Sequence, residues 1–136
     1  ATLCLLNAER ARRGLRTLRV HRELQRASQR YARDMVTRRF FSHVSPSGAG
    51  LLQRTRSTSR YLRRAHGYVL GENLAWGTGT AATPRQIVAG WMRSPGHRRN
   101  VLDRRFREVG LGIAAGVAGT AAGAGATYAS QFGLRR

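Results

Sequence analysis

Three residues of this chain combine a chemically active side chain with a distinctive local sequence, namely two histidines and one glutamate. His43 lies in "FFSHVSPSG", Glu72 in "GENLAWG" and His97 in "SPGHRRN". Two imidazoles and a carboxylate are enough to bind zinc with an open coordination position, or to carry out general acid–base catalysis. Gaps of more than 20 residues do not themselves show that the three side chains meet.

The local setting of each residue separates it from the other charged positions. His43 adjoins a Ser-Pro turn, and His97 follows Ser94 and Pro95 at a predicted helix start. Glu72 has apolar neighbours, namely Leu70, Leu74 and Trp76. An ordinary surface charge explains such a glutamate poorly. The competing interpretation is structural, with Glu72 only accepting hydrogen bonds from backbone and histidine.

No nucleophile with an adjacent base is evident from the sequence. The serines near the two histidines are Ser42, Ser45 and Ser94, and a turn or helix-capping role explains each of them equally well. His21 and His66 lie beside arginines and look incidental.

The net charge of +19 arises from 25 basic residues, all of them arginine. Such a charge implies attraction to nucleic acid, anionic lipid or acidic polymers. The arginines are scattered, however, and no aromatic residues interleave with them to form a base-stacking surface. We therefore expect a solvated, arginine-rich surface that contacts anionic surfaces peripherally and does not recognise a specific nucleic acid.

The 136 residues suit a single domain, 1–136, and no apolar run is long enough to span a membrane. The sequence opens without Met and reads as a cut-out domain or a mature form. Its one cysteine, Cys4, is expected to be buried between Leu3 and Leu5, the alternative being half of a disulfide to residues outside this chain.

Apolar periodicity predicts that helices make up the first part of the chain and strands the last part. Apolar residues spaced three or four positions apart indicate helices over residues 2–15 and 22–40. In the helix over 2–15, polar Asn7 and Arg10 lie on the inner stripe and are expected to bind backbone or a carboxylate. Residues 83–94 carry a helix-start signature, with Thr83 as the N-cap, Pro84 in the first turn and Gln86 completing the capping box. The pattern over residues 51–66 predicts a short helix and then a loop.

Alternation predicts strands over 109–115 and 126–132, joined by a wide hairpin loop over 117–126. Residues 67–79, bracketed by glycines, are expected to be loop-like with at most a short strand. The fold class is therefore α+β, with helices packed on a sheet.

Three motifs carry a resemblance to a known family: "FFSHVSPSG", "GENLAWG" and "WMRSPGHRRNVLDRRFREVGLGI". Together they resemble the CAP superfamily of cysteine-rich secretory, antigen 5 and pathogenesis-related proteins, and most closely its bacterial, SCP-like branch. The resemblance runs from "LNAERARRGL" to "YASQFG". It implies a three-layer α-β-α sandwich with a small, mainly antiparallel sheet, and an extracellular or cell-surface location.

The resemblance also implies a central cleft built from two histidines and two acids. His43 and His97 match the two histidines, and Glu72 matches the acid of the "GEN" motif. Ser94 occupies the place of the second acid, so this chain has a triad. The resemblance then implies that His43 and His97 hold zinc or another divalent metal, with Glu72 as the candidate catalytic group and Ser94 in the cleft.

Three functions remain open at this point. The first is a binding module, expected to be monomeric, that holds a ligand such as a lipid or a cell-wall component in the cleft. The second is a metal-dependent, protease-like hydrolase that uses the same cleft. The third is an electrostatic binder of anionic polymers through the arginine-rich surface.

Overall fold

A computed structural model describes residues 1–119 and 124–136 of the chain. The elements, in chain order, are α1 (Thr2–Ala11), β1 (Arg19–Val20), α2 (Arg22–Thr37), α3 (Leu51–Thr58), β2 (Tyr68–Thr78), the 3₁₀ helix η1 (Gly79–Ala82), α4 (Pro84–Arg93), α5 (Pro95–Leu102), β3 (Glu108–Ala115) and β4 (Gly125–Arg135). Residues 120–123 of the hairpin loop expected over 117–126 lie outside the described residues.

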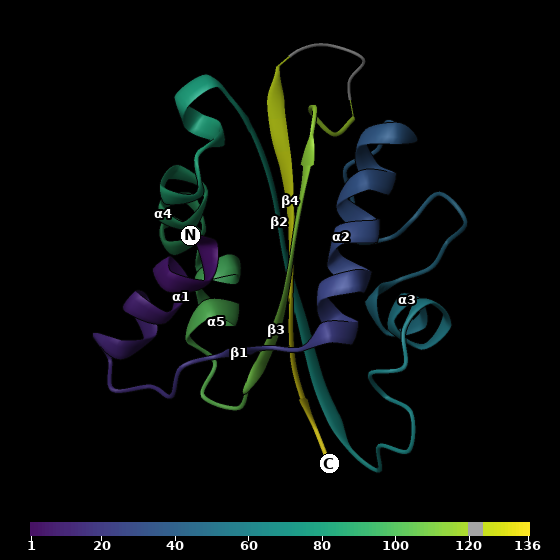
Figure 1. Cartoon of the computed structure of the whole chain (residues 1–136), viewed down its shortest axis with the longest axis vertical. Helices are drawn as coiled ribbons and strands as arrows, with labels where there is room; N and C mark the ends of the chain where they lie inside the picture. Colours follow the sequence, from purple (N-terminus) through teal and green to yellow (C-terminus); the bar gives the residue numbers. More distant parts are fainter. Residues whose placement is uncertain (120–123) are drawn as a thin grey trace.

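The strands form one sheet with the order β1-β3-β4-β2. β1 pairs with β3 in parallel, and the other two pairings are antiparallel. Helices α1, α4 and α5 cover one face of the sheet, and α2 and α3 cover the other (Figure 1). The predicted three-layer α+β sandwich is confirmed, as are the expected strands over 109–115 and 126–132.

Helix α2 forms because apolar residues recur every three or four positions, and it buries Leu24, Tyr31 and Met35 against the sheet. The helix lies so close to β3 that a Cβ atom on Gly110 or Gly112 would overlap its backbone. Glycines on one side of β3 therefore set the distance between this helix and the sheet.

Helix α4 begins as its capping residues predict. Pro84 occupies the first turn, and the Thr83 side chain accepts a hydrogen bond from the Gln86 amide. Its buried face includes Ile87, Val88 and Trp91, which belong to the larger hydrophobic core.

The two polar residues on the inner stripe of α1 bind backbone, as predicted. Asn7 exchanges two hydrogen bonds with Leu18, and the fully buried Arg10 donates to four carbonyl oxygens, those of Arg16, Val101, Asp103 and Phe106.

The expectation that Cys4 is buried is wrong, because its side chain is exposed. The inner stripe of α1 runs through Thr2, Leu6 and Arg10. Residue 4 lies about 200° around the helix from residue 6 and so faces outward.

The expectation of a loop over 67–79 is also wrong. Residues 68–78 form β2, which pairs with β4 along its whole length. Residues 71–74 are all buried because helices cover both faces of the sheet, so the strand shows no polar–apolar alternation. The glycines that suggested a loop are points of close approach: a Cβ on Gly71 would stand 2.8 Å from the Phe106 ring.

Candidate functional site

The site lies along β2, an edge strand of the sheet. Because successive side chains of a strand point to opposite faces, Glu72 faces the layer of α2 and α3 while Asn73 faces that of α5. Side chains from α4 and α5 bind the backbone of this strand, Asn100 donating to the carbonyl of Glu72 and Trp91 to that of Leu74. The edge is thereby covered, which protects it from pairing with another strand.

The Glu72 carboxylate is almost completely buried and is fully engaged. One oxygen, Oε1, lies 2.9 Å from His43 Nδ1. Arg54 donates to both carboxylate oxygens, at 2.8 and 3.1 Å, and Gln131 Nε2 donates to Oε2 at 3.2 Å. Neither Arg54 nor Gln131 stands out in the sequence as part of this arrangement.

Arg54 joins three parts of the site. It comes from α3, donates a 2.9 Å hydrogen bond to the His43 carbonyl oxygen, and stacks its guanidinium 3.5 Å from the centre of the Tyr31 ring. Tyr31 in turn donates its hydroxyl to the Ser42 carbonyl. The backbone that carries the His43 side chain is therefore held by the α2 and α3 layer.

His97 approaches from the other layer, on α5. Its Nδ1 lies 2.9 Å from Ser94 Oγ, and its carbonyl oxygen accepts a hydrogen bond from Asn73 Nδ2. Asn100 links Asn73 Oδ1 to the Glu72 carbonyl. Ser94 is the residue that precedes α5, as predicted, but its side chain makes no helix-capping hydrogen bond and binds His97 instead.

His43 acts electrostatically on His97. Burial lowers the pKa of His97, and the charge of His43 lowers it further. A helix N-terminus also disfavours an imidazolium, so the neutral form of His97 is favoured, with burial as the main cause. His43 is more accessible, with 55% of its side chain exposed.

The fit of this site to a divalent metal rests on two nitrogens. Within residues 1–119 and 124–136 there is no group of three or more His, Cys, Asp or Glu side chains arranged to hold a metal ion. Both Glu72 oxygens already bind Arg54, which makes this carboxylate a poor ligand. His43 and His97 each use Nδ1 internally, which leaves their Nε2 atoms for a ligand. The arrangement around His43, where a carboxylate binds the second ring nitrogen, is the one commonly found behind metal-bound histidines.

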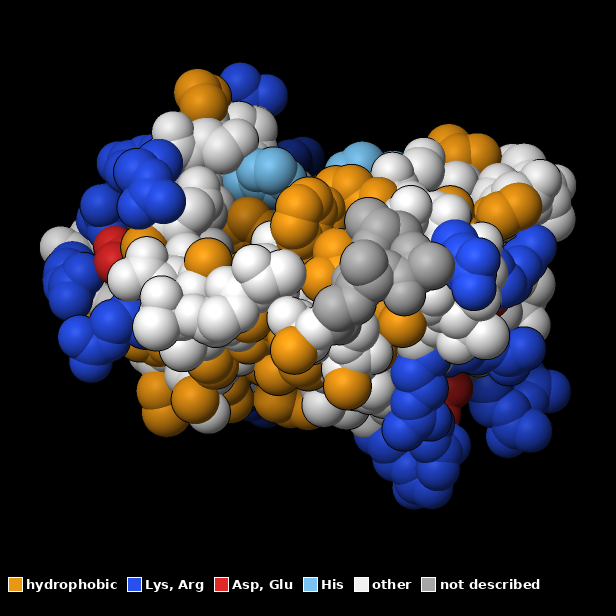
Figure 2. All heavy atoms as spheres, turned by 90° about the horizontal axis from the view of Figure 1, so that it is seen from above, with side chains coloured by type: hydrophobic (Ala, Val, Ile, Leu, Met, Phe, Trp, Pro, Cys, Tyr) orange, Lys and Arg blue, Asp and Glu red, His pale blue; other side chains and the backbone are white. Residues whose placement is uncertain are grey.

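The surface near the histidines is partly apolar. Figure 2 shows histidine side chains next to hydrophobic ones, with arginines gathered toward the two sides of the same face. Phe41 and Val44, which lie close to His43 in the chain, are 44% and 50% exposed, and Trp76 on β2 is 47% exposed.

Comparisons with known proteins agree with this fold. Residues 3–130 match the family described as "CAP: Cysteine-rich secretory protein family". The uncharacterised protein YkwD of Bacillus subtilis is 33% identical over 108 residues, which are 79% of this chain and 39% of YkwD. The chain therefore spans about two fifths of the length of this relative.

Two solved structures are similar over almost the whole chain. An extracellular protein containing an SCP domain from Bacillus anthracis has a TM-score of 0.77 and 25% identity, covering 99% of this chain and 39% of the other. An outer surface protein from Borrelia burgdorferi has a TM-score of 0.80 and covers 98% of this chain and 90% of the other. At 19% identity, this second similarity concerns the fold alone.

Proposed function

Because the chain belongs to the CAP family of cysteine-rich secretory proteins, we propose that it is the binding domain of an extracellular or cell-surface protein. Its ligand site is the β2-edge site, defined by His43, Arg54, Glu72, Ser94 and His97. The extracellular relative from Bacillus anthracis supports the location. Among the described residues, none of the helices has the length and apolar character needed to cross a bilayer.

The state of Glu72 is the observation that carries this proposal. A general base needs a lone pair free to receive a proton from substrate or water. Glu72 is instead buried and held on both oxygens by Arg54. Its role is to fix the ring of His43, so the site presents two oriented imidazoles for binding.

The ligand classes we expect are a lipid or a cell-wall component. The exposed side chains of Phe41, Val44 and Trp76 supply apolar contacts, and the imidazole Nε2 atoms supply polar ones. A large exposed aromatic side chain close to a polar anchor is typical of sites that hold partly apolar ligands.

A divalent metal such as zinc would bind His43 and His97 through Nε2 and link them to a ligand. With two protein ligands its affinity is modest, and water completes the coordination. Because metal and protons compete for imidazole nitrogen, binding weakens below about pH 6.

Calorimetric titration of metal-stripped protein with zinc at about pH 7.5, above the ordinary imidazole pKa, tests the metal part of the proposal. We expect binding by the parent protein and its loss in His43→Ala and in His97→Ala, each with the fold intact by circular dichroism. His66→Ala, which removes an exposed histidine outside the β2-edge site, is the matched control and should bind as the parent does. Absence of zinc heat, or equal binding by His43→Ala, would remove the metal from the proposal.

A serine-type hydrolase, in place of the metal-dependent one considered from the sequence, is the second candidate function, favoured by one contact. Ser94 Oγ lies 2.9 Å from His97 Nδ1, within the distance at which a base activates a hydroxyl nucleophile. Hydrolysis of a p-nitrophenyl ester should then be lost in Ser94→Ala. The control Ser57→Ala, which removes an exposed hydroxyl on α3, should retain it. Equal hydrolysis by Ser94→Ala and the parent protein would remove this candidate.

A further inference from the structure

A second site lies in a cavity of about 500 Å³ between α2, the loop after it, and α3. We propose that this cavity, the α2–α3 pocket, binds a small phosphomonoester that also carries hydroxyl groups, such as a sugar phosphate. The volume is within the range usual for small-molecule sites. The pocket shares Arg54 with the β2-edge site, and Gln131 of its lining also binds Glu72, but its other lining residues lie outside that site.

The charge of the lining favours an anion. Four arginines and a single acid contribute to it: Arg30, Arg33, Arg38, Arg54 and Asp34. Arg38 is paired with Asp34 and Arg54 with Glu72. Arg30 and Arg33 have no acidic partner among the described residues, so the pocket keeps a net positive charge.

Two residues of the lining carry buried polar atoms that lack a partner in the described part of the chain. Arg54 Nε, a donor, and Gln131 Oε1, an acceptor, have no hydrogen-bond partner within the described residues, although both side chains are more than nine-tenths buried. A buried polar group left unpaired is costly, so such atoms need an explanation. A small rotation of the two side chains toward the pocket would let anionic oxygens of a ligand pair with the donor and hydroxyl groups pair with the acceptor.

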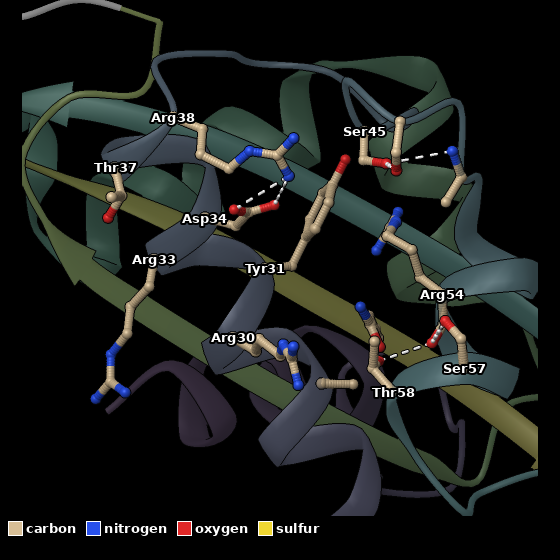
Figure 3. Close-up of a pocket in the computed structure, with 14 residues that line it drawn as sticks. Arg30, Tyr31, Arg33, Asp34, Thr37, Arg38, Ser45, Arg54, Ser57 and Thr58 are labelled. Carbon is tan, nitrogen blue, oxygen red and sulfur yellow. Dashed lines mark hydrogen bonds and ion pairs between the residues drawn. The ribbon is translucent and has the colours of Figure 1, made fainter.

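The directions of the side chains agree with this assignment. Figure 3 shows Arg30, Tyr31 and Asp34 of α2, and Arg38 just after its end, across the pocket from Ser45 and Arg54, with Ser57 and Thr58 beside Arg54. Arg30 extends toward Thr58, whereas Arg33 extends away from the centre of the view. Arg30 is therefore the unpaired charge best placed to bind a phosphate group, and charge-assisted hydrogen bonds from arginine are the usual way to hold one.

Titration with glycerol 3-phosphate, followed by backbone amide NMR shifts, tests the proposal. We expect saturable shifts at amides of the pocket, including Ala49, Ser57 and Thr58. The double variant Arg30→Gln/Arg38→Gln should bind about tenfold more weakly or worse, since hydrogen bonds to charged groups are among the strongest. The matched control Arg85→Gln/Arg104→Gln removes the same charge from exposed positions outside the pocket and should bind as the parent does.

Two further ligands separate phosphate recognition from other sources of binding. Propyl phosphate has the same phosphate group without hydroxyls and should bind more weakly than glycerol 3-phosphate. Three results would overturn the proposal. They are equal binding of the two ligands, equal weakening of binding in both double variants, and no amide shifts at ligand concentrations up to about 10 mM, which corresponds to a dissociation constant weaker than millimolar. Binding to phosphatidic acid vesicles without binding of glycerol 3-phosphate would overturn it in favour of a lipid headgroup.

Discussion

Arg54 decides what Glu72 can do. A buried carboxylate without a cation would be strongly destabilising, and Arg54 neutralises it while also holding the carbonyl of His43. The same contacts that stabilise the fold remove the carboxylate from acid–base chemistry. In the function that we propose, binding at this site therefore depends on the two histidines.

Replacing Arg54 with leucine should lower the free energy of unfolding by about 3–5 kcal/mol, because it leaves the buried Glu72 charge unpaired. Urea denaturation measures the loss. Arg56→Leu, at an exposed position further along α3, is the control and should change stability by no more than about 0.5 kcal/mol. Adding Glu72→Gln to Arg54→Leu should recover part of the stability. Equal stability of the two single variants would show that the buried pair contributes little.

The pKa of His97 should rise in His43→Ala, because the charge of His43 is one cause of its depression. NMR titration of the His97 ring measures the change, and His66→Ala should leave the pKa where it is. Since the folded-state pKa of His97 is lowered, its protonation favours unfolding. Its contribution to stability is therefore lost as pH falls below about 6.5, the ordinary imidazole pKa, toward the folded value. An unchanged pKa in His43→Ala would mean that the two rings are not coupled.

The sequence could indicate the members of the site but not all of their contacts. His43, Glu72 and His97 were found through residue type, setting and family resemblance, and the His43–Glu72 contact is present. Arg54 could not be distinguished, because it is one of 25 arginines and no local pattern separates a buried one from a solvated one. Whether the three residues bind a metal stays a prediction.

At the scale of elements, helices were easier to predict than the strand that carries Glu72. Helix α2 has an exposed face that makes its periodicity visible, and α4 has a capping box at its start. Strand β2 is covered on both faces, so its sequence lacks alternation and its glycines resemble turn signals. Hydrophobic periodicity arises where one side of an element faces the core and the other faces solvent. The centre of β2 has no side that faces solvent, so its sequence shows no such periodicity.

Replacing Gly112 with alanine should lower the free energy of unfolding. The usual cost of overpacking is about 1–3 kcal/mol, and we expect a loss in the upper part of this range. The added Cβ would overlap the carbonyl group of Ser28, so α2 would have to move off the sheet. Thermal unfolding measures the change. In the control Gly96→Ala the new Cβ meets nothing within 4 Å, and alanine is the better helix former in α5. Gly112→Ala with unchanged stability would show that the packing of α2 on β3 adjusts freely.

At the scale of the whole molecule, the charge is far from balanced. All six acidic residues are ion-paired with arginine, so most of the 25 arginines have no acid to neutralise them. Isolated pairs of this kind on the surface add little to stability. The excess charge instead governs what the surface attracts at long range.

Binding to duplex DNA should therefore be non-specific and strongly dependent on salt. The arginines are scattered over the chain, and Figure 2 shows them on two sides of one face with uncharged side chains between. A surface that touches about six phosphates loses roughly a thousandfold in affinity between about 50 and 200 mM salt, because the bound counterions are released. Fluorescence anisotropy with two duplexes of unrelated sequence measures both properties, and the two should bind equally. Preference for one sequence that persists at high salt would mean that the arginines form a specific recognition surface after all.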